Sequence, residues 1–165
     1  MRILLSVTIK GDIEYCKNLS KYIKNCLEEN NHDVDIIVCS EEDFFSEEEE
    51  KIFKLAIENA NDYELVIEIL LNAAANTRER CEFFYKSTIG KKYATKMQER
   101  LAEIFKDCRI SKREDFYMLN QTKAPAIILK MFFCTNPTEW KYAVKNKERI
   151  AKLIANGISD IQRGV

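Results

Sequence analysis

The sequence is poor in the residues on which several classes of protein depend. Its 165 residues include one histidine, His32, with 2 prolines and 4 glycines. A single imidazole excludes chemistry that needs two or more, and so little proline and glycine excludes a collagen-like or low-complexity chain. The net charge of −1 gives no reason to expect nucleic acid or an anionic membrane as a partner. No apolar run approaches the roughly 20 residues of a membrane span.

The cysteines show no pattern typical of metal or redox sites. The chain has six, at Cys16, Cys26, Cys39, Cys81, Cys108 and Cys134, and no two stand in a C-x-x-C arrangement. Most lie among apolar neighbours, where free cysteine behaves as a small buried hydrophobe. The N-terminal apolar run lacks a small-residue cleavage site, so it is interpreted as a strand and not as a signal peptide. We therefore expect free, structural thiols and a reducing, cytoplasmic location.

Hydrophobic periodicity predicts strands that alternate with helices. Apolar, β-branched runs predict strands at residues 2–9, 34–39, 65–71, 82–86, 116–119 and 126–133. A period of three to four residues predicts helices from Glu14 to about Asn31, over residues 46–60 and 93–105, and from Asn136 to the end. The chain is thus expected to form one α/β domain over residues 1–165. Its three layers would be a mostly parallel, twisted sheet of about six strands with helices on both faces.

An acidic run opens the second predicted helix. Ser46 followed by Glu47, Glu48 and Glu49 matches a capping box, in which the hydroxyl and Glu49 bind free backbone amides. Acidic residues in a first turn also complement the helix dipole. The run is therefore interpreted as a helix start in preference to a metal or polycation site.

Three segments together resemble the zinc-dependent N-acetylmuramoyl-L-alanine amidases of the amidase-3 type, which occur in bacterial autolysins and phage endolysins, especially clostridial ones. Residues 63–73, Tyr-Glu-Leu-Val-Ile-Glu-Ile-Leu-Leu-Asn-Ala, look like that family's third-strand motif. Residues 125–136, which end Phe-Cys-Thr-Asn, look like the strand that carries its catalytic glutamate. The N-terminal strand followed by Glu14 and Tyr15 is the third segment, and Arg109 falls where the family usually has Asn-Arg-Gly.

The resemblance implies a zinc site whose residues are mostly replaced. In the family, two histidines and a glutamate hold the metal, and a bound water is activated in the open position. The first histidine falls near Ile9 and the second on Leu70, so only Glu14 remains of the ligands. The catalytic glutamate falls on Lys130. His32 precedes the second strand, at the end of the sheet opposite the ligand-binding crevice, so it cannot substitute. We therefore expect no zinc cofactor and no catalytic residues.

Several of these positions have two interpretations. Glu14 is either a remaining ligand that faces the crevice or an ordinary acid in a first helical turn. Lys130 either pairs with Glu14 or Glu68 and takes over the electrostatic role of the metal, or extends from its strand end to water. Glu68 within an apolar strand favours a structural hydrogen bond. The expected remnant of the family's groove comprises Glu14, Glu68, Leu70, Asn72, Arg109 and Lys130.

Two functions follow from the resemblance. The first is a catalytically inactive, endolysin-like homologue of peptidoglycan amidases, retained to bind a peptidoglycan fragment or a protein such as a second copy of itself. The alternative is an active amidase whose metal is held by Glu14 with Glu68 or a cysteine. The sequence predicts no wall-binding domain, and without a signal peptide the protein would reach the cell wall only through lysis or a pore.

Overall fold

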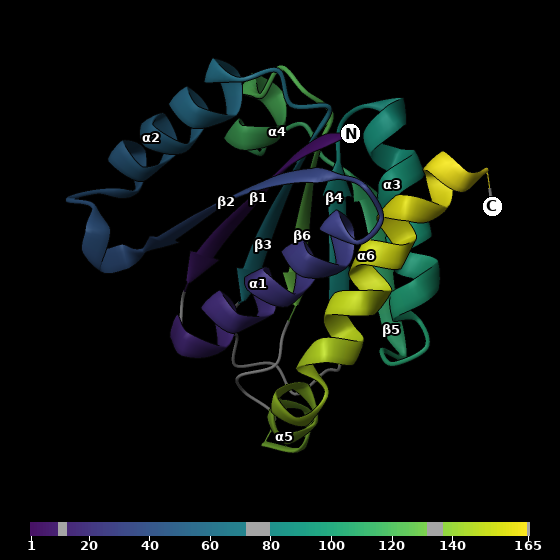
Figure 1. Cartoon of the computed structure of the whole chain (residues 1–165). Coiled ribbons are helices and arrows are strands. Elements are labelled where there is room, and N and C mark those ends of the chain that lie inside the picture. Colours follow the sequence, from purple (N-terminus) through teal and green to yellow (C-terminus); the bar gives the residue numbers. More distant parts are fainter. Residues whose placement is uncertain (10–12, 72–79, 132–136, 165) are drawn as a thin grey trace.

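The computed structural model describes residues 1–9, 13–71, 80–131 and 137–164, and its centre is a six-stranded sheet (Figure 1). The strands lie in the order β2-β1-β3-β6-β4-β5. Their bounds are β1 Arg2–Ile9, β2 Asp33–Ser40, β3 Leu65–Leu71, β4 Arg80–Tyr85, β5 Asp107–Lys112 and β6 Ala126–Met131. Every neighbouring pair is parallel except β4 with β6. The mostly parallel sheet is as predicted.

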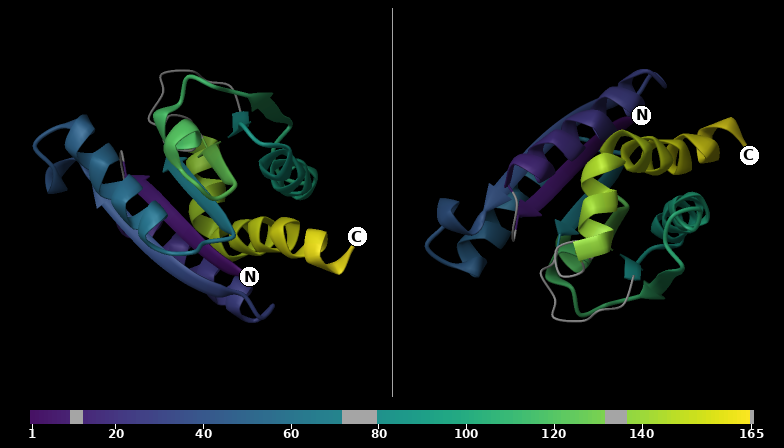
Figure 2. Two further views of the ribbon diagram at one scale, coloured as in Figure 1. Left: turned by 90° about the horizontal axis from the view of Figure 1, so that it is seen from above. Right: turned by 90° about the horizontal axis from the view of Figure 1, so that it is seen from below.

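Helices cover both faces of the sheet, which confirms the three-layer α/β fold (Figure 2). One face packs against α1 (Ile13–Glu28), α3 (Thr88–Leu101), α5 (Pro137–Lys145) and α6 (Lys147–Arg163). The other carries α2 (Glu47–Ala60) and the short α4 (Tyr117–Gln121), and a 3-10 turn (Glu41–Asp43) precedes α2. None of these helices, within the described ranges, is long and apolar enough to cross a membrane.

The alternation of side chains along β3 shows how the two faces differ. Leu65, Ile67 and Ile69 enter the larger core beneath α1, α3 and α6. Val66 faces the smaller apolar cluster under α2 and α4, on which Leu70 also packs. Because successive strand residues point to opposite faces, Glu68 lies on the α2 face as well. This places a carboxylate within an otherwise apolar strand, where it needs a partner.

The core between α3 and α6 depends on a glycine. A Cβ atom added at Gly157 in α6 would lie 2.6 Å from the Met97 Cα and 2.8 Å from its backbone nitrogen. Only a residue without a side chain therefore lets the two helices approach this closely.

The structure corrects three predicted elements. Residues 116–119 were predicted as a strand, but Tyr117–Gln121 form helix α4. The sixth strand is instead β5, whose sequence Asp-Cys-Arg-Ile-Ser-Lys is too polar to indicate a strand. The C-terminal helix is two helices, α5 and α6, with Asn146 between them.

The five cysteines in the described part of the chain are free thiols, as expected. Cys16, Cys39 and Cys81 are buried, and burial raises the pKa of the Cys39 thiol to about 11. A thiol with such a pKa is protonated at neutral pH and is a poor nucleophile. Cys134 lies outside the described residues.

Candidate functional site

The carboxyl ends of β1, β3 and β6 meet at one edge of the sheet, toward which their arrows point in Figure 1. Strand pairing places one residue from each strand in a single row across the sheet near this edge. The row runs Cys39, Thr8, Leu70, Lys130, Glu82 and Arg109. Since paired residues point to the same face, all six side chains lie on the α2 side. The fold thus brings Leu70, Lys130 and Arg109 of the predicted groove together.

The β5 end of this row carries charges of alternating sign. Lys130 pairs in register with Leu70 on one side and Glu82 on the other, and Arg109 is the next residue along. Lys130 is half-buried and Arg109 is exposed. Arg109 also donates from Nε to Asp107 Oδ1 at 2.9 Å. The two cations therefore remain accessible to a ligand at the edge of the sheet.

Glu68, one row further from this edge, belongs to a buried ionic network with α2. The Lys54 ammonium lies 3.3 Å from Glu68 Oε1 and 3.3 Å from Glu50 Oε1, and it donates to the Thr8 hydroxyl. Thr8 in turn donates to Glu50 Oε1 at 3.2 Å. Burial acts to lower the pKa of Lys54, but the charges of Glu68 and Glu50 outweigh it and the pKa is raised. Lys54 is thus a charged, fully paired ammonium inside the protein.

Glu58 completes the network as an uncharged carboxylic acid. It is 1% exposed, and its Oε2 accepts a hydrogen bond from the Thr122 hydroxyl at 2.5 Å. Burial and the neighbouring charge of Glu68 raise the pKa of Glu58 to about 8. Its Oε1 meets no donor among the described residues, because the group beside it is the Glu68 carboxylate. A proton on Glu58, donated to Glu68, satisfies both oxygens.

This network forms the floor of a pocket of about 320 Å³. Thr8, Glu50, Lys54, Glu68 and Leu70 line it on the side of the sheet and α2. Residues 115–118, which include Phe116 and Tyr117, form the opposite wall. The predicted Glu68 and Leu70 therefore share one pocket, close to the carboxyl edge of the sheet.

Lys54, Glu50 and Glu58 belong to this network but were not predicted from the sequence. A signal was available, because the three residues stand four apart and so share one face of the predicted helix. The acidic residue Glu68 within an apolar strand also indicates a buried cationic partner, and the structure shows that this partner is Lys54. The structural hydrogen bond predicted for Glu68 is thereby confirmed.

Glu14 and Glu68, the two carboxylates considered as partners of Lys130, both bind other groups in the described part of the structure. Glu68 gives its ion pair to Lys54, while Glu14 is exposed and accepts a hydrogen bond from Asn18 at 3.3 Å. Glu14 stands in the first turn of α1, a helix whose apolar side packs on the face of the sheet opposite Lys130. The structure thus places Glu14 as a first-turn acid. Ile9 ends β1, and Asn72 lies outside the described residues.

His32 lies at the opposite edge of the sheet, as predicted. It is 5% exposed, and its Nε2 lies 3.1 Å from the Ser159 hydroxyl of α6. Burial lowers the pKa of its imidazole. His32 is therefore a neutral, structural histidine.

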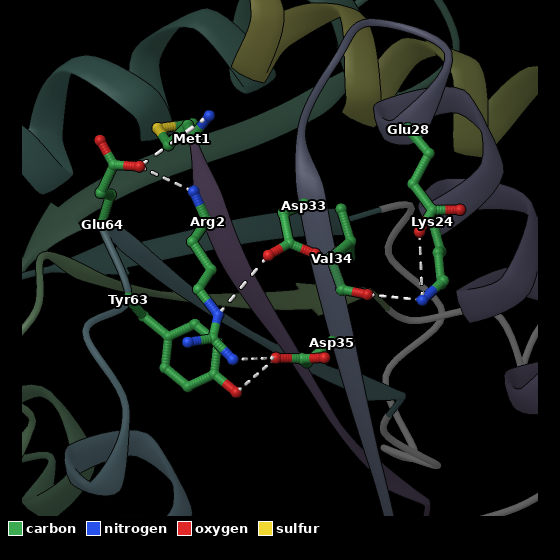
Figure 3. Close-up of polar contacts among 9 residues, drawn as sticks. All are labelled: Met1, Arg2, Lys24, Glu28, Asp33, Val34, Asp35, Tyr63 and Glu64. Carbon is green, nitrogen blue, oxygen red and sulfur yellow. Dashed lines mark hydrogen bonds and ion pairs between the residues drawn. The ribbon is translucent and has the colours of Figure 1, made fainter.

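Polar contacts close the same amino-terminal edge of the sheet (Figure 3). Asp35 accepts hydrogen bonds from the Tyr63 hydroxyl at 2.8 Å and from the Arg2 guanidinium at 3.1 Å. The Arg2 backbone donates to Glu64 at 2.7 Å. Burial and the hydrogen bond to Asp35 raise the pKa of Tyr63 to about 12. These groups stabilise β1, β2 and the start of β3 and bind one another.

Comparison with known proteins identifies the family. The family model for N-acetylmuramoyl-L-alanine amidase, Amidase_3, matches residues 9–160. The chain belongs to the amidase-3 family. The catalytic domain of the CD27L endolysin targeting Clostridia Difficile is 31% identical, with a TM-score of 0.87 and 96% of each chain covered. A comparison with curated proteins gives no match.

More distant amidase-3 structures share the fold over almost their whole length. The CwlD amidase from Clostridioides difficile, solved in complex with the GerS lipoprotein, superimposes with a TM-score of 0.77 at 17% identity. The catalytic domain of CwlV from Bacillus (Paenibacillus) polymyxa var. colistinus gives 0.73 at 16% identity. Each comparison covers 99% of both chains. The resemblance predicted from the sequence motifs is confirmed at the level of family and fold.

Side chains that can bind metals do not cluster in the described part of this amidase-3 domain. Residues 1–9, 13–71, 80–131 and 137–164 contain no group of three or more histidine, cysteine, aspartate or glutamate side chains that could hold a metal ion. Glu50, Glu58 and Glu68 approach one another, but Lys54 occupies the space between two of them. An ammonium has no lone pair to offer a metal.

Proposed function

We propose that this amidase-3 domain is a non-hydrolytic homologue of peptidoglycan amidases, retained to bind a cell-wall fragment. The observation that carries the proposal is the pairing of Leu70 with Lys130 across β3 and β6. The family resemblance assigns a zinc-binding histidine to the first position and the catalytic glutamate to the second. Leucine has no donor atom for zinc, and a lysine ammonium accepts neither a metal nor a proton.

The described donors fit a zinc site poorly, which supports the proposal. Glu14, the ligand that the resemblance retains, is exposed in the first turn of α1 and accepts a hydrogen bond from Asn18. Glu68 is committed to Lys54 and to the proton of Glu58. A rearranged metal site of Glu14 with Glu68 would have to break this buried network, so an active amidase is the less favoured alternative.

Lys130 and Arg109 give the edge of the sheet a binding capacity. They stand on either side of Glu82 in the row, and both remain at least partly accessible. Cationic side chains bind carboxylates through charge-assisted hydrogen bonds, and the peptide stems of peptidoglycan carry carboxylates. The neighbouring pocket adds the Tyr117 ring, on which a sugar or peptide can pack.

Co-sedimentation with purified bacterial cell walls tests binding and hydrolysis in the same tubes. The protein is incubated with walls in zinc-supplemented buffer, wall turbidity is followed, and the pellet is analysed. We expect protein in the pellet with undiminished turbidity. The double variant Lys130→Ala with Arg109→Ala should remain in the supernatant, whereas Lys112→Ala, which removes an exposed lysine from the same edge strand, should pellet like the wild type.

A fall in turbidity would contradict the non-hydrolytic proposal and point to the alternative amidase. A wild-type protein that stays in the supernatant would contradict wall binding, and the function would then be binding to a protein. Zinc retained at one ion per chain after dialysis would show that a metal site exists despite Leu70 and Lys130.

A further inference from the structure

Helix α2 buries two charged residues and exposes several apolar ones, while Ile57 packs against the smaller apolar cluster. Its buried side chains are Lys54 and Glu58, whereas Ile52 is 58% exposed and Phe53 is 42% exposed. Ala56, one turn further along, is also exposed. Helices that cover a sheet normally turn an apolar stripe inward. Because the ionic network with Glu68 attaches α2 to the sheet, this stripe is left at the surface.

Phe45 extends the exposed apolar surface beyond the start of α2. Its side chain is fully exposed, and the preceding Phe44 packs on Phe53 with ring centroids 5.3 Å apart. A residue before a helix N-cap often packs on the fourth helical residue. Here that residue is Glu50, which turns inward to Lys54. We call Phe45, Ile52, Phe53 and Ala56 the outer face of α2.

Specific hydrogen bonds hold the segment that presents Phe45. The Phe45 backbone donates to Glu49 Oε2 at 2.8 Å, and Ser46 caps the helix by accepting from the Glu49 backbone at 3.2 Å. One turn earlier, Asp43 Oδ2 accepts from the Ser40 backbone and hydroxyl at 2.7 and 2.9 Å. Phe45 is thus presented by an ordered turn, and its exposure is a property of the fold.

Acidic side chains lie at the amino-terminal end of this outer face. Residues 41–50 contain seven acidic residues and no basic one. The exposed members are Glu42, Asp43, Glu47, Glu48 and Glu49. The helix dipole accounts for acids in the first turn of α2, as the sequence indicated. It does not account for Glu42, or for the exposed apolar residues beside these acids.

We propose that the outer face of α2 is a docking surface for another protein, which presents apolar side chains flanked by lysine or arginine. Exposed apolar patches rimmed by charge mark interaction sites, and complementary charge favours a basic partner. A symmetric contact with a second copy would place this acidic rim against itself, which disfavours a homodimer through this surface. The site is separate from the wall-binding proposal, because none of the four residues of the outer face lines the pocket.

A labelled peptide tests the proposal in solution. The probe is a helical peptide of about 14 residues with leucines on one face and lysines on the other, and its counterpart has glutamate in place of lysine. Fluorescence anisotropy against the full chain should show binding of the lysine peptide only. The affinity should weaken as NaCl rises from about 0.05 M to about 0.3 M, because salt screens exposed charges.

Two surface variants locate the binding site. Ile52→Gln and Phe45→Ser together should weaken binding by roughly tenfold or more, since apolar side chains at the centre of an interface dominate its affinity. Their melting temperature should stay within about 2 °C of the wild type, because neither side chain is buried. The matched control is Ile89→Gln, since Ile89 at the start of α3 is 52% exposed and should bind the peptide normally.

Three results would overturn the proposal. The first is no binding of the lysine peptide, or equal binding of the glutamate peptide. The second is equal loss of affinity in Ile89→Gln, which would mean that binding is not confined to α2. The third is a concentration-dependent dimer in analytical ultracentrifugation that Ile52→Gln abolishes, because a second copy would then cover the surface.

Discussion

Replacing Glu58 by glutamine should stabilise the protein at neutral and alkaline pH. Glu58 is buried beside Glu68, with its pKa raised to about 8 from an ordinary value of 4.5. Glutamine reproduces the protonated acid, because its amide can donate to Glu68 while its oxygen accepts from Thr122. Unlike the acid, the amide loses no proton when the chain unfolds. Most substitutions of buried polar residues destabilise, so the sign of this prediction is distinctive.

The size of the effect follows from proton linkage. Between pH 4.5 and about 8 the folded protein holds a proton on Glu58 that the unfolded chain releases. Stability from this group is therefore complete below pH 4.5 and falls as pH rises through the window, by about 1.4 kcal/mol per pH unit. At about pH 7 the free energy of unfolding is therefore lower by roughly 3 kcal/mol than at pH 4.5. Glu58→Gln should recover about that much relative to its effect at acidic pH.

Urea unfolding from about pH 4.5 to about pH 8.5 measures the difference directly. The free energies of unfolding of the two proteins should diverge with rising pH, with the glutamine variant the more stable. Glu42→Gln, at an exposed position, is the control and should track the wild type. A constant difference across the range would refute the reasoning, because Glu58 would then be ionised in the folded protein. Infrared spectroscopy adds a second readout, since the carbonyl band of a protonated acid should disappear in Glu58→Gln alone.

Three further changes probe other parts of the structure. Lys54→Met should destabilise the folded protein by about 3–5 kcal/mol, because it leaves the buried Glu68 carboxylate without a cation. A loss below about 1 kcal/mol in urea unfolding would contradict the role of this network. Since burial lowers the pKa of His32 below 6.5, the unfolded chain binds the extra proton and stability should fall as pH drops below that value. His32→Gln should flatten this acid limb, and an unchanged limb would assign it to other groups. Gly157→Ala should lower the melting temperature, because the added Cβ would meet the Met97 backbone. This loss should exceed the gain of about 1 kcal/mol in helix propensity that alanine brings. A raised melting temperature would show that α6 can shift.

The predictable part of the fold is the part that is buried on a regular period. The strand at residues 65–71 and the helices with one apolar stripe, such as α1, follow directly from hydrophobic pattern. Strand β5 was not predicted, because three of its six residues, Asp107, Arg109 and Lys112, are charged. Its position at the edge of the sheet also requires little burial. The pairing of β4 with β6 in antiparallel orientation depends on long-range packing, which local sequence does not record.

The sequence indicated which residues share a position in the sheet, but not which residues α2 turns toward it. Leu70, Lys130 and Arg109 share a row because motif and register agree. The pair of Glu68 with Lys54 could not be read from hydrophobic pattern, since that pattern would have turned Ile52 and Phe53 toward the sheet. A few strong polar contacts thus fix which side of α2 faces the sheet and leave Ile52 and Phe53 exposed.

The polar sequence of β5 has a consequence for solubility. This strand ends the sheet, so one side of its backbone has no neighbouring strand among the described elements and could pair with the edge of another molecule. Charged side chains at Asp107, Arg109 and Lys112 make such stacking costly. A substitution such as Arg109→Val would give the segment the β-branched pattern of an ordinary strand, and would also turn it into a template for aggregation.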